Sequence, residues 1–332
     1  MFDTLPEVSH VETMMDGILD SLKGTESLDL TYAQRYVIGV LDSNDITRSS
    51  VTGTEGLLSD IGDGLAKVWE YVKKMFKAIW DFFFGKKNKE DSEVAKASVK
   101  STEEAIKEVE SPQVTEENVK TVVSQVEKKV NKLPESPKKK ELQKKVETVK
   151  AAEPAKAKAA APGLIKEVFD ADLADKPKLN EMAKKFNVLY EDLTARKEEY
   201  AKNEGDRKVL GHAIQTFLNG FTGLKEPRKG LAETKAWITW AHRCLEATDN
   251  SLETIRAMKS EHEHAIRDTQ AKIDGLSKSQ YSKQELIEEI TDLKRVMATV
   301  VTVIKLAEQT RECISEMAKG IEACCIKTKE KS

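Results

Sequence analysis

The chain is 332 residues long, with 33% charged, 39% hydrophobic and only 6% aromatic residues. This composition is typical of helical proteins and argues against a fold built mainly from strands. The formal net charge of -3 argues against general nucleic-acid binding, which would favour a strongly basic surface. We therefore predict an all-α protein with no specific nucleic-acid partner.

Two short helical patterns occupy the N-terminal helical segment, residues 1–54. Their apolar residues recur every three or four positions. They are Val8, Val11, Met14, Met15, Ile18, Leu19 and Leu22 in the first pattern, and Tyr32, Tyr36, Val37, Ile38, Val40 and Leu41 in the second. The opening MFDTLPEVSH has neither the basic region nor the apolar core of a secretory signal, so secretion by that route is not expected.

The most informative stretch is GLLSDIGDGLAKVWEYVKKMFKAIWDFFFGKK, residues 56–87. Apolar residues at helical spacing, with charged residues opposite them, predict an amphipathic helix over residues 55–85. Its many aromatic residues widen the apolar side beyond the narrow stripe of a coiled coil. The residues expected to bind a partner or a membrane surface are Leu58, Ile61, Leu65, Val68, Trp69, Val72, Phe76, Ile79, Trp80, Phe83 and Phe84.

Two environments remain open for this aromatic helix. Charged residues such as Lys67, Glu70 and Asp81 interrupt every run long enough to span a bilayer, so a membrane-bound helix would lie flat in the interface. Trp and Lys suit that depth, because each has an apolar body and a polar tip. Alternatively, the helix packs on its own protein or on a copy of itself, since aromatic residues also dominate protein interfaces.

The composition changes abruptly at residues 86–163, where no aromatic residue occurs and Lys, Glu, Ala, Val, Ser and Pro predominate. Valines and leucines at helical spacing after Thr115 predict weak, exposed helices. Pro134 and Pro137 interrupt them, and AAEPAKAKAAAPG at 151–163 is typical of an extended, flexible spacer. We therefore predict that residues 86–163 form a tether.

Aromatic and aliphatic residues return in residues 164–332, where four or five helices can be traced. The last and longest begins at a capping box formed by Ser282 and Glu285, and its apolar ridge runs from Leu286 to Leu306. Long helices separated by short breaks predict an antiparallel helical bundle.

The sequence offers no residue pattern typical of catalysis, of cofactor binding or of a metal site. His262 and His264 are two apart on a predicted helix and so point to different sides, which predicts a solvated helix face. Gly62 and Gly64 lack the preceding strand and the third glycine of a nucleotide-binding loop. The four cysteines show no CxxC spacing and are expected to be reduced. We predict a non-enzymatic protein.

The run GTEGLLSDIGDGLAKVWEYVKKMFKAIWDFFFGKK, followed by a Lys/Glu/Ala-rich tether and a helical bundle, resembles structural or internal virion proteins of tailed bacteriophages. The resemblance covers the first third of the chain and rests on overall character. It implies packaging in the particle as a structural or internal head protein, contacts with other virion proteins or with copies of itself, and in some cases ejection toward the host envelope.

Two other functions remain open from the sequence. One is a scaffolding oligomer with no membrane role, and the other is an α-helical pore-forming protein. The expected location is the virion, or otherwise the cytoplasm.

Overall fold

The computed structural model describes residues 6–23, 30–43, 61–84, 86–200, 206–220, 230–276 and 281–328. Over these residues the chain forms helices and turns and no strand, which confirms the all-α prediction. The chain divides into two compact units. Unit 1 contains residues 1–88, 200–211 and 253–304, and unit 2 contains residues 89–199, 212–252 and 305–332. The units therefore do not follow the four consecutive segments predicted, because in each unit late helices pack with early ones.

Unit 1 is built around the aromatic helix α4. Its described helices are α1 (Pro6–Lys23), α2 (Tyr32–Ser43), α4 (Ile61–Phe84), α12 (Lys259–Leu276) and the first part of α13 (Lys283–Glu322). α1 packs against both α2 and α4, and α4 packs against α12. Lys294 of α13 forms an ion pair with Asp16 of α1.

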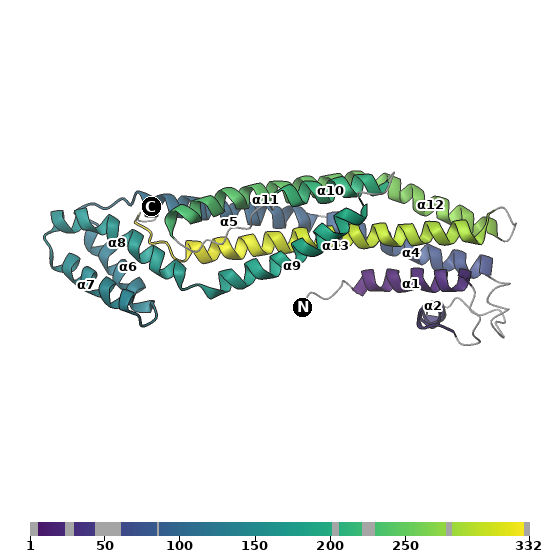
Figure 1. Cartoon of the computed structure of the whole chain (residues 1–332), viewed down its shortest axis with the longest axis horizontal. Coiled ribbons are helices and arrows are strands. Elements are labelled where there is room, and N and C mark those ends of the chain that lie inside the picture. Colours follow the sequence, from purple (N-terminus) through teal and green to yellow (C-terminus); the bar gives the residue numbers. More distant parts are fainter. Residues whose placement is uncertain are drawn as a thin grey trace. The chain divides into compact units, whose positions relative to one another are not determined.

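Helices α1 and α2 cross steeply, since Figure 1 shows α1 along its length and α2 end-on. The crossing is close at Gly17, where a Cβ atom would collide with Cγ2 of Val37 and with the carbonyl of Ala33. The apolar stripe predicted for the first helix lies in the core from its second turn onward. Its buried members are Val11, Met14, Met15, Ile18, Leu19 and Leu22.

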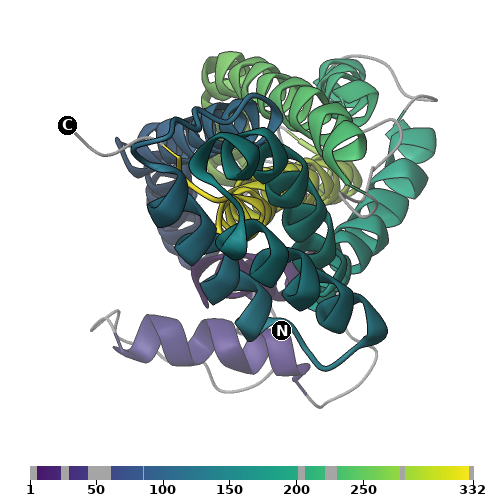
Figure 2. The same cartoon turned by 90° about the vertical axis from the view of Figure 1, so that its left-hand side faces the viewer.

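Unit 2 contains most of the remaining helices. They are α5 (Lys86–Glu110), α6 (Val119–Lys132), α7 (Pro137–Ala151), α8 (Pro154–Ala174), α9 (Pro177–Tyr200), α10 (Asp206–Gly220), α11 (Leu231–Ala257) and the last part of α13. Unit 1 includes the first part of α10, residues 206–211, and a few residues at the ends of α5, α9 and α11. α6, α7 and α8 pack against one another pairwise, and Figure 2, where they face the viewer, shows them as one group.

Residues 86–163 form helices, as predicted, but these helices pack into a core instead of forming a tether of weak, exposed helices. The apolar residues of α6 and α7 are buried rather than exposed, including Val126, Val130 and Leu142. Each short helix carries only a narrow apolar stripe, but three stripes turned toward one another form a shared core. The surrounding lysines and glutamates pair across helices, as Lys145 does with Glu167 at 2.7 Å.

The spacer predicted at 151–163 lies mostly in α8. Pro154 occupies the first turn, where its missing N–H is not needed, and the alanines that follow favour a helix. Ala157 and Ala161 are buried, so this alanine-rich stretch forms part of the packed face. Pro162 lies inside the helix, and α8 continues through it to Ala174.

Close backbone contacts and hydrogen bonds join the long helices of unit 2. Thr102 of α5 is fully buried, and its Oγ1 donates to the carbonyl of Ala318 in α13 at 3.0 Å. Gly220 of α10 faces α11 so closely that a Cβ atom there would collide with the Cβ of Ala247. The Cys244 thiol donates to the Gly220 carbonyl at 3.1 Å.

Candidate functional site

The aromatic helix predicted from the sequence is present as α4, and its apolar residues lie on one face. That face is covered by protein of the same unit, since α1 and α12 both pack against α4. Seven of the expected binding residues are only 0 to 7% exposed: Leu65, Val68, Trp69, Val72, Phe76, Ile79 and Trp80. The helix therefore forms the core of unit 1, as the alternative of packing on its own protein expects.

Of the four remaining expected binding residues, the structure describes the side chain of Phe84 alone. Leu58 lies outside the described residues, as do the side chains of Ile61 and Phe83. Phe84 is half-buried, and the guanidinium carbon of Arg256 lies 5.4 Å from its ring centroid. Arg256 Nη2 also donates to the Phe84 carbonyl at 3.3 Å. This contact holds the C-terminal end of α4 through a cation above an aromatic face.

Trp69 and Trp80 are both buried, but their indole N–H groups are in different situations. Trp69 Nε1 donates to the carbonyl of Ile266 in α12 at 3.0 Å. Trp80 Nε1 is buried and has no hydrogen-bond partner among the described residues. A buried hydrogen-bond donor without a partner destabilises the folded state by about 1–3 kcal/mol. The indole N–H of Trp69 therefore stabilises the α4–α12 contact, whereas that of Trp80 weakens it.

His262 lies in this contact, which corrects the prediction that it belongs to a solvated helix face. It is 2% exposed, and its ring centroid lies 6.2 Å from that of Phe76 and 5.8 Å from that of Trp80. The physical reason is the spacing of α12, which places His262 one turn from the buried Met258 and one turn from the buried Ile266. His264 does point outward, and its Nδ1 lies 3.1 Å from a carboxylate oxygen of Asp268.

The rings of Phe76, Trp80 and His262 form one cluster, and His262 adds a second polar atom without a hydrogen-bond partner to it. Its Nδ1 lies 2.9 Å from the Met258 carbonyl, whereas its Nε2 has no hydrogen-bond partner among the described residues. Two unpartnered nitrogens, those of Trp80 and His262, therefore lie within one cluster of rings between α4 and α12.

A small groove follows the α4–α12 contact on its outer side, with a volume of about 180 Å³. Its apolar lining comes from Phe76, Trp80 and Ile266, and its polar lining is mainly basic. The charged lining residues are Lys73, Lys77, Lys259, Glu263 and Arg267. Lys259 is already engaged by Asp81 at 3.3 Å and Glu263 at 3.9 Å. The groove thus combines an aromatic floor with a positive rim.

A second polar cluster, which the sequence analysis did not identify, surrounds Asp249 in unit 2. Its carboxylate accepts from Lys96 Nζ and from Arg311 Nη2, both at 2.6 Å, and from Ser92 Oγ at 2.9 Å. Burial alone would raise the pKa of Asp249, but hydrogen bonds from these three groups hold that pKa below its ordinary value. The Arg311 side chain is only 5% exposed, whereas those of Asp249 and Lys96 are 26% and 44% exposed, so this charge network is partly buried and joins three helices.

Within the described residues, no His, Cys, Asp and Glu side chains group closely enough to hold a metal ion. Across that same part of the chain, none of the helices combines the length and the apolar character needed to cross a membrane. Comparisons with family models, with curated proteins and with solved structures found no match to the chain.

Proposed function

We propose that the chain is a non-enzymatic structural or internal protein of a tailed-bacteriophage particle, in which α4 serves as the structural centre of unit 1. The structural role is supported by the burial of the aromatic face of α4 against α1 and α12. The particle role is supported by the sequence resemblance of residues 53–87 to virion proteins. A partner or a membrane meets the aromatic face only after unit 1 opens.

The energy of this burial determines how α4 behaves. Seven large apolar side chains at about 1.5–3 kcal/mol each amount to roughly 10–20 kcal/mol, as an upper estimate, for covering the face. Spontaneous exposure of a face with that stabilisation is rare. Any external surface that receives α4 must therefore offer a comparably apolar environment, such as a bilayer interface or the apolar groove of a partner.

Membrane binding after opening is a second candidate function, and a specific observation favours it. The α4–α12 contact buries two nitrogens without hydrogen-bond partners, those of Trp80 and His262, so separating the two helices lets both be solvated. The exposed side of α4 also carries Lys67, Lys74 and Lys77, which suit an anionic lipid surface. These features weaken the closed state and favour an interfacial helix.

Tryptophan emission with anionic vesicles separates the two candidates. The chain has four tryptophans, so a full-length variant with Trp237→Phe and Trp240→Phe leaves Trp69 and Trp80 of α4 as the reporters. The structural proposal predicts no spectral change for this variant, because its rings are already buried. A peptide of residues 54–89, which has no covering helices, serves as the positive control and is expected to become helical with a blue-shifted emission.

Quenching by brominated lipids then shows where the rings are. If the full-length variant is quenched as strongly as the peptide, α4 leaves unit 1 for the membrane and the second candidate is correct. If the peptide itself does not bind, membrane binding by α4 is refuted and the structural role alone remains.

Mass spectrometry of purified particles tests the virion role directly. We expect the chain at a defined copy number in intact particles, and its absence from them would contradict the proposal. Analytical ultracentrifugation of the purified chain distinguishes self-association from assembly that needs other virion proteins.

A further inference from the structure

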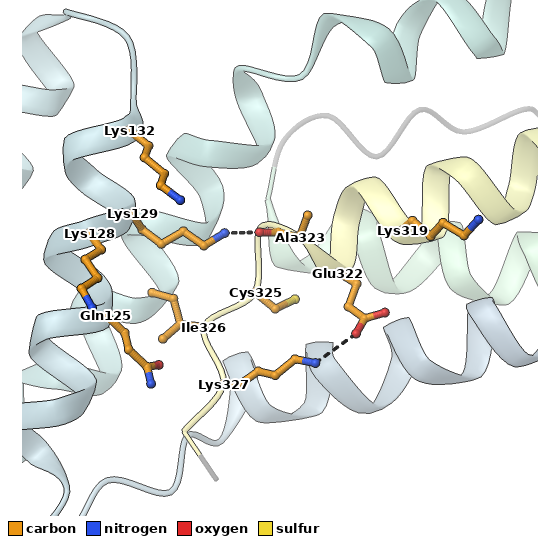
Figure 3. Close-up of a pocket in the computed structure, with 10 residues that line it drawn as sticks. All are labelled: Gln125, Lys128, Lys129, Lys132, Lys319, Glu322, Ala323, Cys325, Ile326 and Lys327. Atoms are coloured by element: carbon orange, nitrogen blue, oxygen red, sulfur yellow. Dashed lines mark hydrogen bonds and ion pairs between the residues drawn. The ribbon is translucent and has the colours of Figure 1, made fainter. Parts of the chain in front are cut away.

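A pocket in unit 2 gathers an unusual number of lysines where α6 approaches the end of α13 (Figure 3). Its volume is about 560 Å³, within the range of about 300–1,000 Å³ common for small-molecule sites. The charged residues that line it are Lys128, Lys129, Lys132, Lys319, Glu322 and Lys327. Five lysines and one glutamate line the pocket, and it keeps a net positive charge although the whole chain carries a formal net charge of -3.

The acidic groups near the pocket are already engaged. Glu322 accepts from Lys327 Nζ at 3.2 Å and from Ser101 Oγ at 3.1 Å. Lys319 pairs with Glu316 at 3.1 Å, and Figure 3 shows its side chain directed away from α6. These pairs leave no carboxylate in the pocket for the remaining lysines of α6.

Lys129 is held in a fixed position by two partners. Its ammonium lies 3.0 Å from a carboxylate oxygen of Asp172 in α8, and it also donates to the carbonyl of Ala323 at the end of α13. Its side chain is 23% exposed. A cation oriented in this way loses little further conformational freedom when an anion binds beside it.

Lys128 and Lys132 lie four residues apart on the same helix, and both are exposed. Neither makes a hydrogen bond or an ion pair with any described residue, and Figure 3 shows Lys132 directed toward Lys129. Like charges at this spacing destabilise a helix by about 0.2–0.5 kcal/mol. Lysines at helix C-termini often stabilise free carbonyl groups, but here Lys129 has that role for Ala323. Lys128 and Lys132 therefore have no carboxylate partner among the described residues, although Lys132 lies in the last turn of α6, where the helix dipole favours a cation.

We propose that this pocket binds a small anion carrying two or more phosphate groups. Lys129 supplies the fixed cation, and Lys128 and Lys132 close on the outer phosphate oxygens as flexible point charges. The buried Cys325 and Ile326 form an apolar floor that suits a compact ligand. A small anion fits better than duplex nucleic acid, because the pocket is concave and the rest of the chain is net acidic.

Isothermal titration calorimetry of the full chain with inorganic tripolyphosphate at low salt tests the proposal. We expect one saturable site whose affinity falls as salt rises. The double variant Lys128→Gln with Lys132→Gln should weaken binding at least about tenfold. The matched control is Lys140→Gln with Lys144→Gln, which removes two exposed lysines at the same spacing on α7, outside the pocket, and should bind like the wild type.

Equal affinities for the two double variants would overturn the proposal, as would the absence of any saturable binding by the wild type. Circular dichroism checks that both variants remain folded, and neither pair is buried.

Further titrations identify the source of the phosphates. ATP binding as tightly as tripolyphosphate supports recognition of the phosphate chain, and weaker binding of orthophosphate supports the need for more than one phosphate. Duplex DNA that binds more tightly than tripolyphosphate at equal phosphate concentration, and displaces it, would refute a small-anion site in favour of nucleic acid. These results do not depend on whether the chain is a virion protein.

Discussion

Trp69 and Trp80 offer a test of how α4 is held in unit 1, because the same substitution should have different effects at the two positions. Both indoles are buried, at 0% and 3% exposure. Replacing either by phenylalanine removes the same atoms, although Trp80 also lines the groove beside α12 and packs on the rings of Phe76, Phe84 and His262. A main difference between the two positions is the indole N–H, which donates to the Ile266 carbonyl at Trp69 and has no partner at Trp80.

The expected magnitudes follow from these two environments. Trp69→Phe loses a hydrogen bond worth about 0.5–1.5 kcal/mol in addition to the cavity cost. Trp80→Phe leaves a space that opens onto the groove and removes an unpartnered buried donor, which relieves about 1–3 kcal/mol. We therefore expect Trp69→Phe to be less stable than Trp80→Phe by about 2 kcal/mol or more, and Trp80→Phe to lie close to the wild type.

Urea denaturation followed by far-ultraviolet circular dichroism measures this difference without relying on tryptophan emission. Because the chain has two units, the comparison uses the transition that both substitutions shift. Equal destabilisation by the two substitutions, or a larger loss for Trp80→Phe, would refute the assignment of the Ile266 hydrogen bond as a stabilising contact of α4.

Three further predictions concern unit 2. Gly220→Ala should destabilise the chain by about 1–3 kcal/mol, because the added methyl overlaps α11. Gly163→Ala, in an open part of α8, should stabilise it by about 0.5–1 kcal/mol. Thermal unfolding of the two variants should therefore show a lower midpoint for the first and a higher midpoint for the second. The lowered pKa of Asp249 contributes stability that is present above its ordinary value of 3.8 and is lost as the pH falls through the lowered folded pKa. Acid titration of urea midpoints should therefore show a flatter profile for Asp249→Asn, and an unchanged profile would contradict the role of the network. Burial raises the pKa of the Cys324 and Cys325 thiols to about 12, so both should resist iodoacetamide at pH 8 in the native chain and react after unfolding, as read by mass spectrometry.

The local structure of this chain was largely predictable from its sequence. The spacing of apolar residues alone places Trp69, Phe76 and Trp80 on one face of α4, because a helix brings residues three or four apart to the same side. The capping box of Ser282 and Glu285 forms at the start of α13, with Ser282 Oγ accepting from the Glu285 N–H at 3.1 Å.

The tertiary structure decided which surfaces those helical faces meet. Residues 86–163 look too poor in apolar residues for a core when counted along the chain, yet stripes from α6, α7 and α8 combine into one because burial depends on neighbours in space. The sequence predicts a solvated His262, but packing against α4 buries it. The pocket lysines of α6 likewise lie beside the end of α13, which is far from them in the sequence. Periodicity is a property of one segment and can be read from the sequence. The availability of the aromatic face depends on packing between segments far apart in the chain, and that packing has buried seven residues of this face and left Phe84 half-buried.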